Sequence, residues 1–466
     1  MRTRAPRALP NSDPEPEPLE ALVIDLWRAV HESDRFASAL LAEAFRERRL
    51  RAPRARAFVA DTLYAMLRAE RTIDEALRLG RAEGRASSLA AGRAEAPADE
   101  GPGTEPSTWE RLLAARVLAG WLKPELAARR CAGIDWDAVA GVDAWIDSLS
   151  DPVARVAIAG SLPGFVAERL VEERADAALP LARALRGRPP VTLRANALAT
   201  TRDALADALR EEGVETRPGR LAGAALQVVG GANVFSLDAF RRGLFEMQDE
   251  GSQLVAELVA PPPRGLVVDF CAGAGGKTLA IAAALGGRGR VLAADPTPAR
   301  VDELRRRARR AGASNVRAVV LDADAERPLP EALAAVVGRA DRVLLDAPCT
   351  GLGSLRRNPE ARLRLDPREF TRLPHLQREI AERALPLLAP GGRLIYATCT
   401  LLRAENEAIV EALLEAHPEL ELVAPKEIWG RERAQPLTGE DERFLELTPD
   451  RHDTDGFFAA ILRRRR

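Results

Sequence analysis

The sequence is poor in lysine, in aromatic residues and in long apolar runs. Only three of its 68 basic residues are lysines, namely Lys123, Lys277 and Lys426, and aromatic residues make up 4%. No apolar run approaches the roughly 20 residues that span a membrane, so we expect no membrane partner. The first residues are rich in Arg, Pro and Glu and lack the apolar stretch of a secretory signal.

Cysteine is also scarce, and the four cysteines are far apart, with no CxxC pair. This spacing is typical of a reduced, cytoplasmic protein and excludes a dense disulfide framework. There are too few neighbouring His and Cys residues for a zinc site, so we expect no metal. The four are Cys131, which we expect to be structural, Cys271, Cys349 and Cys399.

Charge is nearly balanced, with a formal net value of -1, and 46% of the residues are hydrophobic. Such a composition predicts a soluble globular protein, and 466 residues are enough for two or three domains. Net charge alone does not indicate nucleic-acid binding, because a nucleic acid responds to local basic patches.

The first part of the chain has the spacing of helices. We expect a disordered tail over residues 1–18, followed by an all-helical domain over 19–184. Residues 81–107 are mostly Ala, Gly, Glu and Pro, which predicts a flexible loop within that domain. One helical stripe is formed by Val59, Leu63, Met66 and Leu67.

The pattern changes after Pro189 and Pro190. Short apolar runs around one helical segment predict a small α/β module, similar to an RNA-recognition motif, over residues 185–250. From residue 251 to 466, strand-like and helix-like segments alternate, which predicts a doubly wound, Rossmann-like sheet. The expected strands are 266–270, 290–294, 316–321, 342–346, 393–398 and 456–462.

A glycine-rich turn follows the first of these strands, at residues 269–278. A strand, a glycine turn and a helix start form a cradle for a nucleotide or a cofactor. The P-loop pattern fails, because Cys271 stands where its first glycine belongs. The dinucleotide pattern fails too, because the glycine spacing is GxGG.

S-adenosylmethionine (AdoMet) fits the remaining pattern. Asp295 and Asp322 end the next two strands, where carboxylates can bind the ribose and lie near the adenine. Acidic groups at successive strand ends disfavour a phosphate-rich ligand and tolerate a sulfonium. Alternatively, the two aspartates only cap the helices that follow. The expected AdoMet contacts are Cys271, Ala272, Gly273, Ala274, Gly275, Gly276, Lys277, Asp295, Asp322 and Asp346.

Two cysteines follow the next two strands, Cys349 after Asp346-Ala347-Pro348 and Cys399 after Thr398. Beside a methyl donor, a thiolate that adds to C6 of cytosine makes C5 nucleophilic enough to accept the methyl group. A carboxyl near N3 assists this addition, and Asp346 is the candidate. The alternative for each cysteine is a small buried hydrophobe.

These motifs resemble those of the RNA 5-methylcytosine methyltransferases of the RsmB/Sun (NOL/NOP/Sun) type. The resemblance covers roughly residues 190–466, with Ala274 where proline is commoner and Ala195 where valine is usual. Its motifs in this chain are 269–278, Asp346 to Cys349, Thr398-Cys399, Arg194 to Asn196, Gln248-Asp249 and Thr454 to Phe458.

The resemblance implies specific roles. Cys399 would be the nucleophile, Cys349 would assist release of the enzyme, Asp346 would act at N3 and Lys277 would support the site. The substrate would be a cytosine in RNA, with small-subunit rRNA the expected partner, and we expect a monomer. The helices around residues 54–59 resemble a NusB-type RNA-binding domain.

Two other functions stay open. One is a non-catalytic RNA-binding assembly factor that kept the fold. The other is a DNA cytosine-C5 methyltransferase, which would use Cys349 as its nucleophile, because a Pro-Cys motif serves that purpose there.

Overall fold

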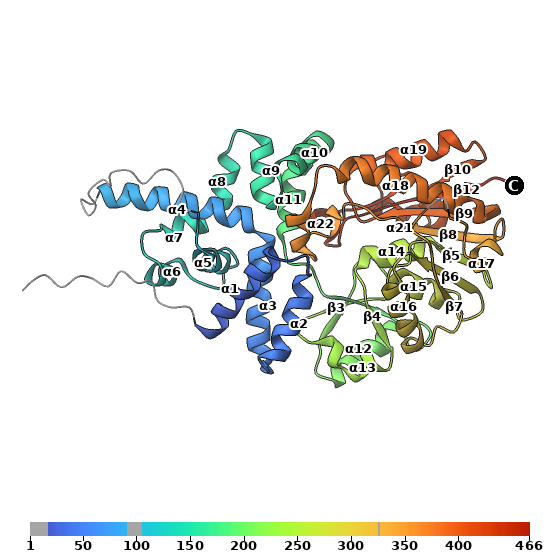
Figure 1. The fold of residues 1–466 in the computed structure, drawn as a ribbon, viewed down its shortest axis with the longest axis horizontal. Helices are drawn as coiled ribbons and strands as arrows, with labels where there is room; N and C mark the ends of the chain where they lie inside the picture. Colours follow the sequence, from blue (N-terminus) through green and yellow to red (C-terminus); the bar gives the residue numbers. More distant parts are fainter. Residues whose placement is uncertain (1–16, 91–104, 325–326) are drawn as a thin grey trace, which may run out of the picture. The chain divides into compact units, whose positions relative to one another are not determined.

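The computed structural model describes residues 17–90, 105–324 and 327–466. The chain divides into two compact units (Figure 1). The helical unit comprises the chain up to Gly187 together with Asn358–Arg364, and the α/β unit comprises Arg188–Arg357 and Leu365–Arg466. Each unit is described below by itself.

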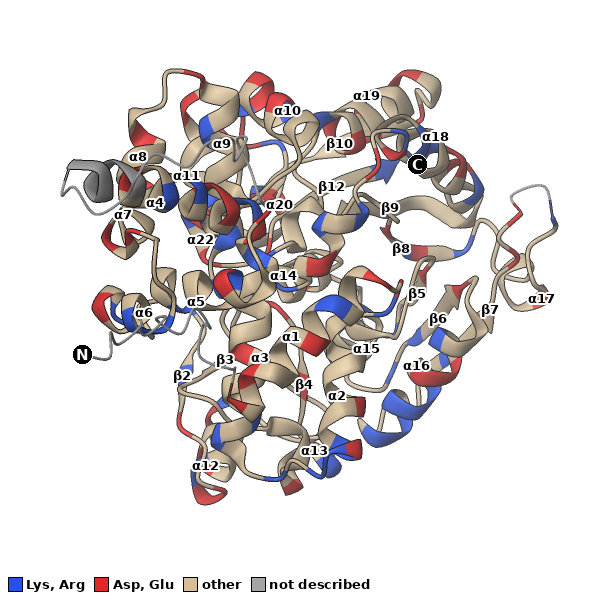
Figure 2. Ribbon diagram, turned by 60° about the vertical axis from the view of Figure 1, so that its left-hand side comes forward, with Lys and Arg blue, Asp and Glu red and all other residues tan. Residues whose placement is uncertain are grey.

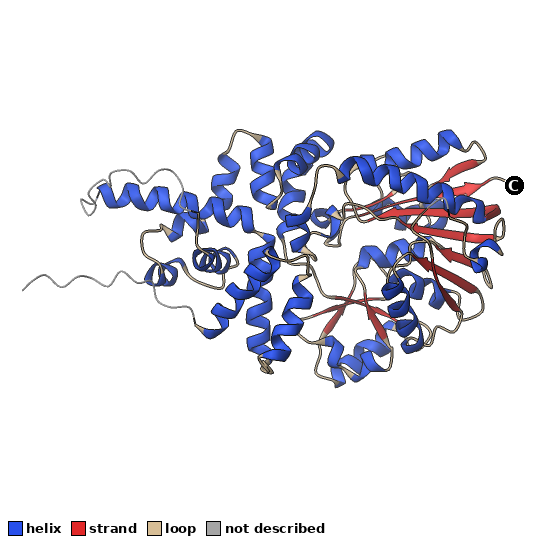
Figure 3. Cartoon of the chain, in the orientation of Figure 1, coloured by secondary structure: helices blue, strands red, loops and turns tan. Residues whose placement is uncertain are grey.

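The described part of the helical unit contains helices joined by loops and no strand, as Figure 3 shows. The predicted stripe on α3 is buried, with Val59 and Leu63 fully enclosed. The first helix starts at Pro18, and residues 1–16 of the predicted tail lie outside the described residues. The α-helices are α1 (Pro18–His31), α2 (Ala37–Glu47), α3 (Pro53–Arg68), α4 (Glu70–Ala90), α5 (Thr108–Leu118), α6 (Pro124–Arg130), α7 (Trp136–Ala140), α8 (Val142–Ser148), α9 (Pro152–Gly160), α10 (Gly164–Arg174) and α11 (Ala178–Arg186).

The predicted flexible loop over 81–107 is wrong at its start, because α4 continues to Ala90. Gly84 within the predicted loop, and Gly80 just before it, are packing positions. A Cβ on Gly80 would lie 2.7 Å from the carbonyl oxygen of Asp135, and one on Gly84 would lie 3.1 Å from that of Gly133. Glycine therefore allows α4 to approach the 133–135 turn closely. Residues 91–104 of the expected loop lie outside the described residues.

Residues 358–364 differ from the predicted division, which assigned them to the methyltransferase domain. They form the short helix η4 (Pro359–Arg364) and group with the helical unit. The side chain of Glu360 is buried and accepts a hydrogen bond from the backbone of Ala37 over 3.1 Å. Buried Arg362 donates to the carbonyl of Leu185 over 2.6 Å. Because these partners are far away in sequence, periodicity could not reveal the grouping.

The α/β unit begins with a four-stranded antiparallel sheet in the order β2-β3-β1-β4. Its strands are β1 (Thr192–Ala195), β2 (Thr216–Pro218), β3 (Ala225–Val228) and β4 (Phe245–Met247). The helices α12 (Arg202–Glu211) and α13 (Asp238–Arg241) belong to this module. The short apolar runs and the helical segment predicted for this module correspond to β1, β3, β4 and α12, whereas the short and largely exposed strand β2 was not predicted.

The second sheet has eight strands, with the order β10-β12-β9-β8-β5-β6-β7 and with β11 paired to β12. The five strands β5 to β9 are parallel, and β10, β11 and β12 pair antiparallel. All six predicted strands are present, which confirms the Rossmann-like class. They are β5 (Leu266–Asp269), β6 (Arg290–Asp295), β7 (Val316–Val320), β8 (Ala340–Asp346), β9 (Leu388–Thr398) and β12 (Phe457–Arg464), joined by β10 (Leu420–Val423) and β11 (Leu445–Leu447).

Helices cover both faces of this sheet. Alternate side chains of β5 enter different cores, Val267 with Leu279 and Val268 with Ile409. The larger helices are α14 (Glu250–Leu258), α15 (Gly276–Ala284), α16 (Pro298–Arg310), α18 (Glu369–Ala384) and α19 (Glu407–Ala416), and the short ones are α17 (Glu331–Ala334), α20 (Lys426–Trp429), α21 (Arg431–Ala434) and α22 (Pro449–His452). Figure 2 shows the basic residues along α16.

The strand order reverses between β5 and β8, which places a crevice at the carboxyl ends of these strands. Ligands of doubly wound sheets bind at such a crevice. Within the described ranges, no helix is long and apolar enough to cross a membrane.

Candidate active site

The turn after β5 owes its shape to two glycines with positive φ. Gly273 has φ +53° and Gly275 has φ +88°. A Cβ on Gly275 would lie 2.7 Å from the side chain of Leu304, so glycine lets the turn pack against α16. A Cβ on Gly273 would meet no described atom within 4 Å. That backbone therefore faces open space, as a ligand cradle requires.

Two arginine side chains hold the carbonyls of this turn, one from the small module and one from α16. Buried Arg194 on β1 donates to the carbonyl of Gly276 over 2.7 Å and also bonds Gln248. Arg307 on α16 donates to the carbonyl of Ala274 over 2.8 Å and pairs with Glu246 on β4. Two motifs that the sequence singled out, at 194–196 and 248–249, thus support the predicted cofactor turn.

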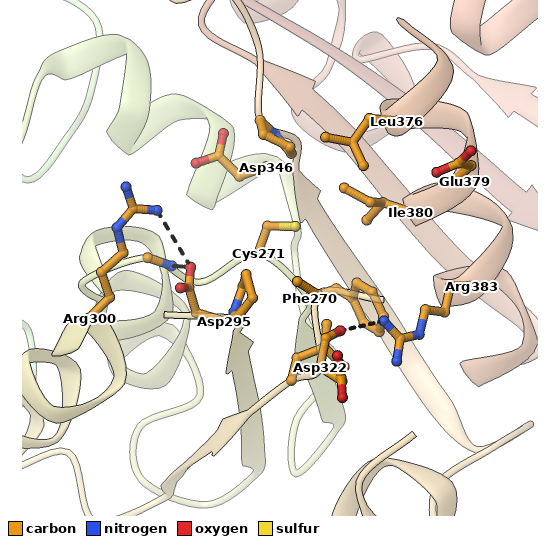
Figure 4. A pocket seen from close by; sticks show the side chains of 15 residues that line it. Phe270, Cys271, Asp295, Arg300, Asp322, Asp346, Leu376, Glu379, Ile380 and Arg383 are labelled. Carbon is orange, nitrogen blue, oxygen red and sulfur yellow. Dashed lines mark hydrogen bonds and ion pairs between the residues drawn. The ribbon is translucent and has the colours of Figure 1, made fainter. Parts of the chain in front are cut away.

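A cavity of about 400 Å³ opens at the ends of β5, β6 and β7 (Figure 4). It is lined by Cys271, Gly273, Asp295, Asp322 and Asp346, all of which the sequence predicted as cofactor contacts. The part of its apolar wall that α18 contributes was not predicted, because the sequence of α18 matches no recognisable motif. That wall contains Phe270, Leu321, Leu376 and Ile380, with the charged groups of Arg300, Glu379 and Arg383 nearby.

The two strand-end aspartates differ in their surroundings. Buried Asp295 accepts hydrogen bonds from the backbone of Gly273 over 2.9 Å and from that of Thr297 over 2.8 Å. It therefore shapes the turn and also lines the cavity. Asp322 is exposed, and among the described residues its carboxylate accepts a local bond of 3.0 Å from the backbone of Asp324, while its backbone carbonyl accepts from Arg383 over 2.7 Å. Both aspartates retain carboxylate lone pairs for a ligand.

A second cavity of about 400 Å³ shares Cys271, Gly273 and Asp346 with the first. At its floor, Lys277 donates to Asp346 over 2.7 Å, and the ammonium lies 5.0 Å from the ring of Phe457. Burial lowers the pKa of Lys277, but the Asp346 carboxylate, together with Cys399 and Asp269, outweighs burial and the net pKa is raised. Lys277 is therefore a charged group at neutral pH.

Asp269 lines the same cavity, and the sequence analysis did not assign it a role. One of its oxygens accepts a bond of 2.6 Å from the hydroxyl of Thr278. The other oxygen is buried and has no hydrogen-bond partner among the described residues. Burial raises the pKa of Asp269 to about 7. An unsatisfied buried oxygen beside the glycine turn indicates a place for a hydrogen-bond donor from a ligand.

Cys349 and Cys399 meet although 50 residues separate them. Their Sγ atoms lie 3.4 Å apart, and the backbone of Gly353 donates to the carbonyl of Cys399 over 2.9 Å. Both are partly exposed, as a reactive thiol must be. Neither thiol lines either cavity, but Pro348, which precedes Cys349, lines the first cavity and Lys277 lines the second. The structure thus brings the two predicted thiols together at the edge of the site.

The two thiols have different electrostatic surroundings. The hydrogen bond with Cys399, together with burial and the nearby Glu405 carboxylate, raises the pKa of Cys349. The raised pKa keeps Cys349 protonated at neutral pH. Cys399 is one of the groups that raise the pKa of Lys277, so this thiol and the ammonium lie close enough to interact. Cys131 is buried in the helical unit, as expected of a structural cysteine.

The closing motif, 454–458, contributes a buried charged cluster beside the second cavity. Arg357 donates to Asp455 over 2.8 Å and to Asp249 over 2.9 Å, and Arg356 lies 3.3 Å from Asp455. Burial, followed by the charge of Asp455, raises the pKa of Asp249 to about 6. The arginines were missed, because only their folded position reveals their partners.

Comparison with known proteins identifies the family. The family model of the 16S rRNA methyltransferase RsmB/F matches residues 256–463, and that of a ferredoxin-like domain of RsmF/B-like methyltransferases matches 162–235. The NusB-type resemblance stays a prediction.

Two curated relatives and one solved structure illustrate the match. A probable ribosomal RNA small subunit methyltransferase B of Bacillus subtilis is 33% identical over 68% of this chain and 70% of its own length. The 25S rRNA (cytosine-C(5))-methyltransferase nop2 of Schizosaccharomyces pombe is 33% identical over 59% of this chain and 46% of its own. A methyltransferase homolog of Pyrococcus horikoshii has a TM-score of 0.58 at 25% identity, over 68% of this chain and 100% of its own. The chain belongs to the RsmB/F family of ribosomal RNA methyltransferases.

Proposed function

We propose that this protein transfers a methyl group from AdoMet to C5 of a cytosine in RNA, and that small-subunit rRNA is its substrate. The observation that carries the proposal is the pair of thiols, Cys349 and Cys399, 3.4 Å apart beside the predicted cofactor site. The name of the S. pombe relative specifies methylation at cytosine C5, which supports the same position here.

The residues present fit AdoMet. The unsatisfied oxygen of Asp269 suits a donor such as the ammonium of the methionine part, and Asp295 suits the ribose hydroxyls. The apolar wall around Leu376 and Ile380, close to Asp322, suits the adenine. When bound, AdoMet supplies an electrophilic methyl group on a sulfonium.

Covalent catalysis assigns a task to each group around the base. Cys399 gives up its proton to water, and its sulfur bonds to C6, so that the electron pair of the C5–C6 double bond becomes available at C5. N3 takes up a proton as the adduct forms, its N–H donates to the Asp346 carboxylate, and Lys277 keeps that carboxylate oriented over their 2.7 Å contact. C5 then accepts the methyl group, and the electrons of the broken bond stay on the sulfur of the donor. The C5–C6 double bond re-forms as C5 and N3 give up their protons to water and the Cys399 thiolate is expelled. Cys349 assists this release.

Methyl transfer can be measured directly with purified protein, labelled AdoMet and small-subunit rRNA. We expect label in RNA as 5-methylcytosine, its loss in Cys399→Ala, and full activity in Cys131→Ala as the matched control. An absence of transfer to any RNA would refute the proposal and favour a non-catalytic assembly factor. Transfer to DNA rather than RNA, with Cys349 essential for the first attack, would favour the DNA-type enzyme.

A further inference from the structure

A buried carboxylate joins the two loops that carry the thiols. Glu405, at the end of the short helix η6 (Arg403–Glu405), is fully buried. Its Oε1 accepts from the hydroxyl of Thr350 over 2.6 Å and from that of Thr400 over 3.0 Å. Thr350 follows Cys349 and Thr400 follows Cys399, so one oxygen contacts the neighbour of each thiol.

The other oxygen strengthens the same connection. Oε2 accepts from the backbone of Thr350 and from the side chain of Gln377, each over 2.9 Å. The same Gln377 nitrogen lies 2.9 Å from the carbonyl of Pro348, which precedes Cys349. Buried Tyr396 donates to the backbone carbonyl of Glu405 over 2.6 Å. The carboxylate is thus surrounded by donors that hold the cysteine loops.

The next residue acts on the second loop alone. Asn406 accepts from the hydroxyl of Thr398 over 2.5 Å and donates to the carbonyl of Thr400 over 3.4 Å. These contacts lie on both sides of Cys399. Asn406 therefore shapes one loop, and Glu405 connects it to the other.

We propose that Glu405 is a positioning residue that holds the Cys349 and Cys399 loops at the separation needed for covalent catalysis. The proposal rests on the function proposed above. A carboxylate with two oxygens accepts several charge-assisted hydrogen bonds at once, and these are stronger than bonds between neutral groups. Glutamine at this position has one acceptor oxygen, and its NH₂ group would face donors. Replacement therefore loosens the link between the loops without removing a thiol.

The separation of the thiols can be tested without any RNA. Phenylarsine oxide condenses with two adjacent thiols, forming two S–As bonds and releasing water, and it requires sulfurs that approach each other closely. We expect the wild type to bind it through Cys349 and Cys399, as mass spectrometry of the adduct would show. Glu405→Gln should bind at least about tenfold more weakly, while the matched control Glu411→Gln, on exposed α19 surface, should bind like the wild type.

Catalysis provides the second measurement. If 1 Å of misplacement costs about a hundredfold in rate, Glu405→Gln should lose about that factor in kcat. Its KM for AdoMet should not change, since Glu405 lines neither cavity in the described structure. A merely structural role would change the folded fraction and leave the kcat of the folded enzyme intact.

If Glu405→Gln does not fold, variants of the two threonines that donate to Glu405 test the same link between the loops. Thr350→Val and Thr400→Val each remove one hydroxyl donor at unchanged size, and Thr350→Ser should restore the binding of the arsenical. Unchanged arsenical binding and kcat in all folded variants would overturn the proposal, as would a wild type that does not bind the arsenical. A wild type that binds the arsenical but methylates no RNA would instead refute the proposed function.

Discussion

Lys277, in the first turn of α15, and Asp346, the last residue of β8, form a 2.7 Å ion pair. The point at which the strand order reverses, between β5 and β8, brings the two residues together. A charge pair at this position can orient a base on one side and a methyl donor on the other. Its two members therefore need not act in the same step.

Removal of the lysine charge should impair catalysis strongly. We expect Lys277→Met to lower methyl transfer by about a hundredfold or more, because the variant leaves the Asp346 carboxylate without its cation and Cys399 without a neighbouring positive charge. Lys426→Met is the matched control, since Lys426 pairs with Glu442 at the surface. Initial rates with saturating AdoMet measure the difference, and equal rates for the two variants would contradict it.

Alanine variants of the two cysteines should lose turnover at different steps of the reaction. Cys399→Ala should form no adduct and transfer no methyl group. Cys349→Ala should still attack and methylate, then stall as a covalent complex with RNA that survives denaturation and migrates slowly on a gel. Cys131→Ala should turn over normally. Accumulation of the adduct in Cys399→Ala would reverse the roles, and two structural cysteines would trap no adduct in either variant.

The proposed contact between Asp295 and the ribose predicts that removal of this carboxylate lowers the affinity for AdoMet. Asp295→Ala should weaken binding by roughly 10- to 100-fold, since hydrogen bonds to a charged group contribute about 1.5–3 kcal/mol. Asp302→Ala, on the exposed surface of α16, should bind like the wild type. Isothermal titration calorimetry compares the two. An unchanged affinity of Asp295→Ala would remove the aspartate from the cofactor site.

The raised pKa of Asp269 predicts that the free energy of unfolding of the protein without AdoMet depends on pH. Its pKa of about 7 lies above the ordinary value of 3.8, so the unfolded chain ionises first as the pH rises. The stability that the protonated form contributes is therefore present below about pH 4 and lost between about pH 4 and pH 7.

Relative to Asp269→Asn, the wild-type free energy of unfolding should fall by about 2 kcal/mol between pH 5 and pH 7. Urea denaturation at several pH values measures this difference. The control Asp302→Asn should change little with pH, and a flat difference for Asp269→Asn would mean that Asp269 is already ionised at pH 5.

The close approach of α4 predicts a packing defect in the helical unit. Gly80→Ala places a Cβ 2.7 Å from the Asp135 carbonyl and should destabilise the unit by roughly 1–3 kcal/mol. Gly164→Ala is the control, because its Cβ meets no described atom within 4 Å and should slightly stabilise α10. Hydrogen exchange of the α4 amides reports the local effect, and equal protection in both variants would contradict it.

The sequence predicted those elements of the fold and of the site that depend on patterns of neighbouring residues. Alternating apolar runs identified the six main strands, and the glycines at 273 and 275 identified the turn after β5 that we propose holds the cofactor. Because parallel strands end at one edge of a sheet, the sequence also placed Cys349 and Cys399 at the edge that carries this turn.

The sequence could not predict contacts that only folding creates. The wall of α18, the role of Asp269 and the arginine contacts to the cofactor turn depend on partners far along the chain. The start of the loop expected over 81–107 was wrong, because Gly84 serves close packing within α4 rather than flexibility.

Residues 358–364 belong to the helical unit although they lie within the sequence of the α/β unit, and this limits how the helical unit can be deleted or lost in evolution. The chain passes between the two units three times, after Gly187, after Arg357 and after Arg364. A truncation that removes residues up to 187 would leave Glu360 and Arg362 without the surroundings that bury them. The helical unit therefore cannot be cut away at a single junction. A relative that lost the helical unit would also need substitutions in residues 358–364.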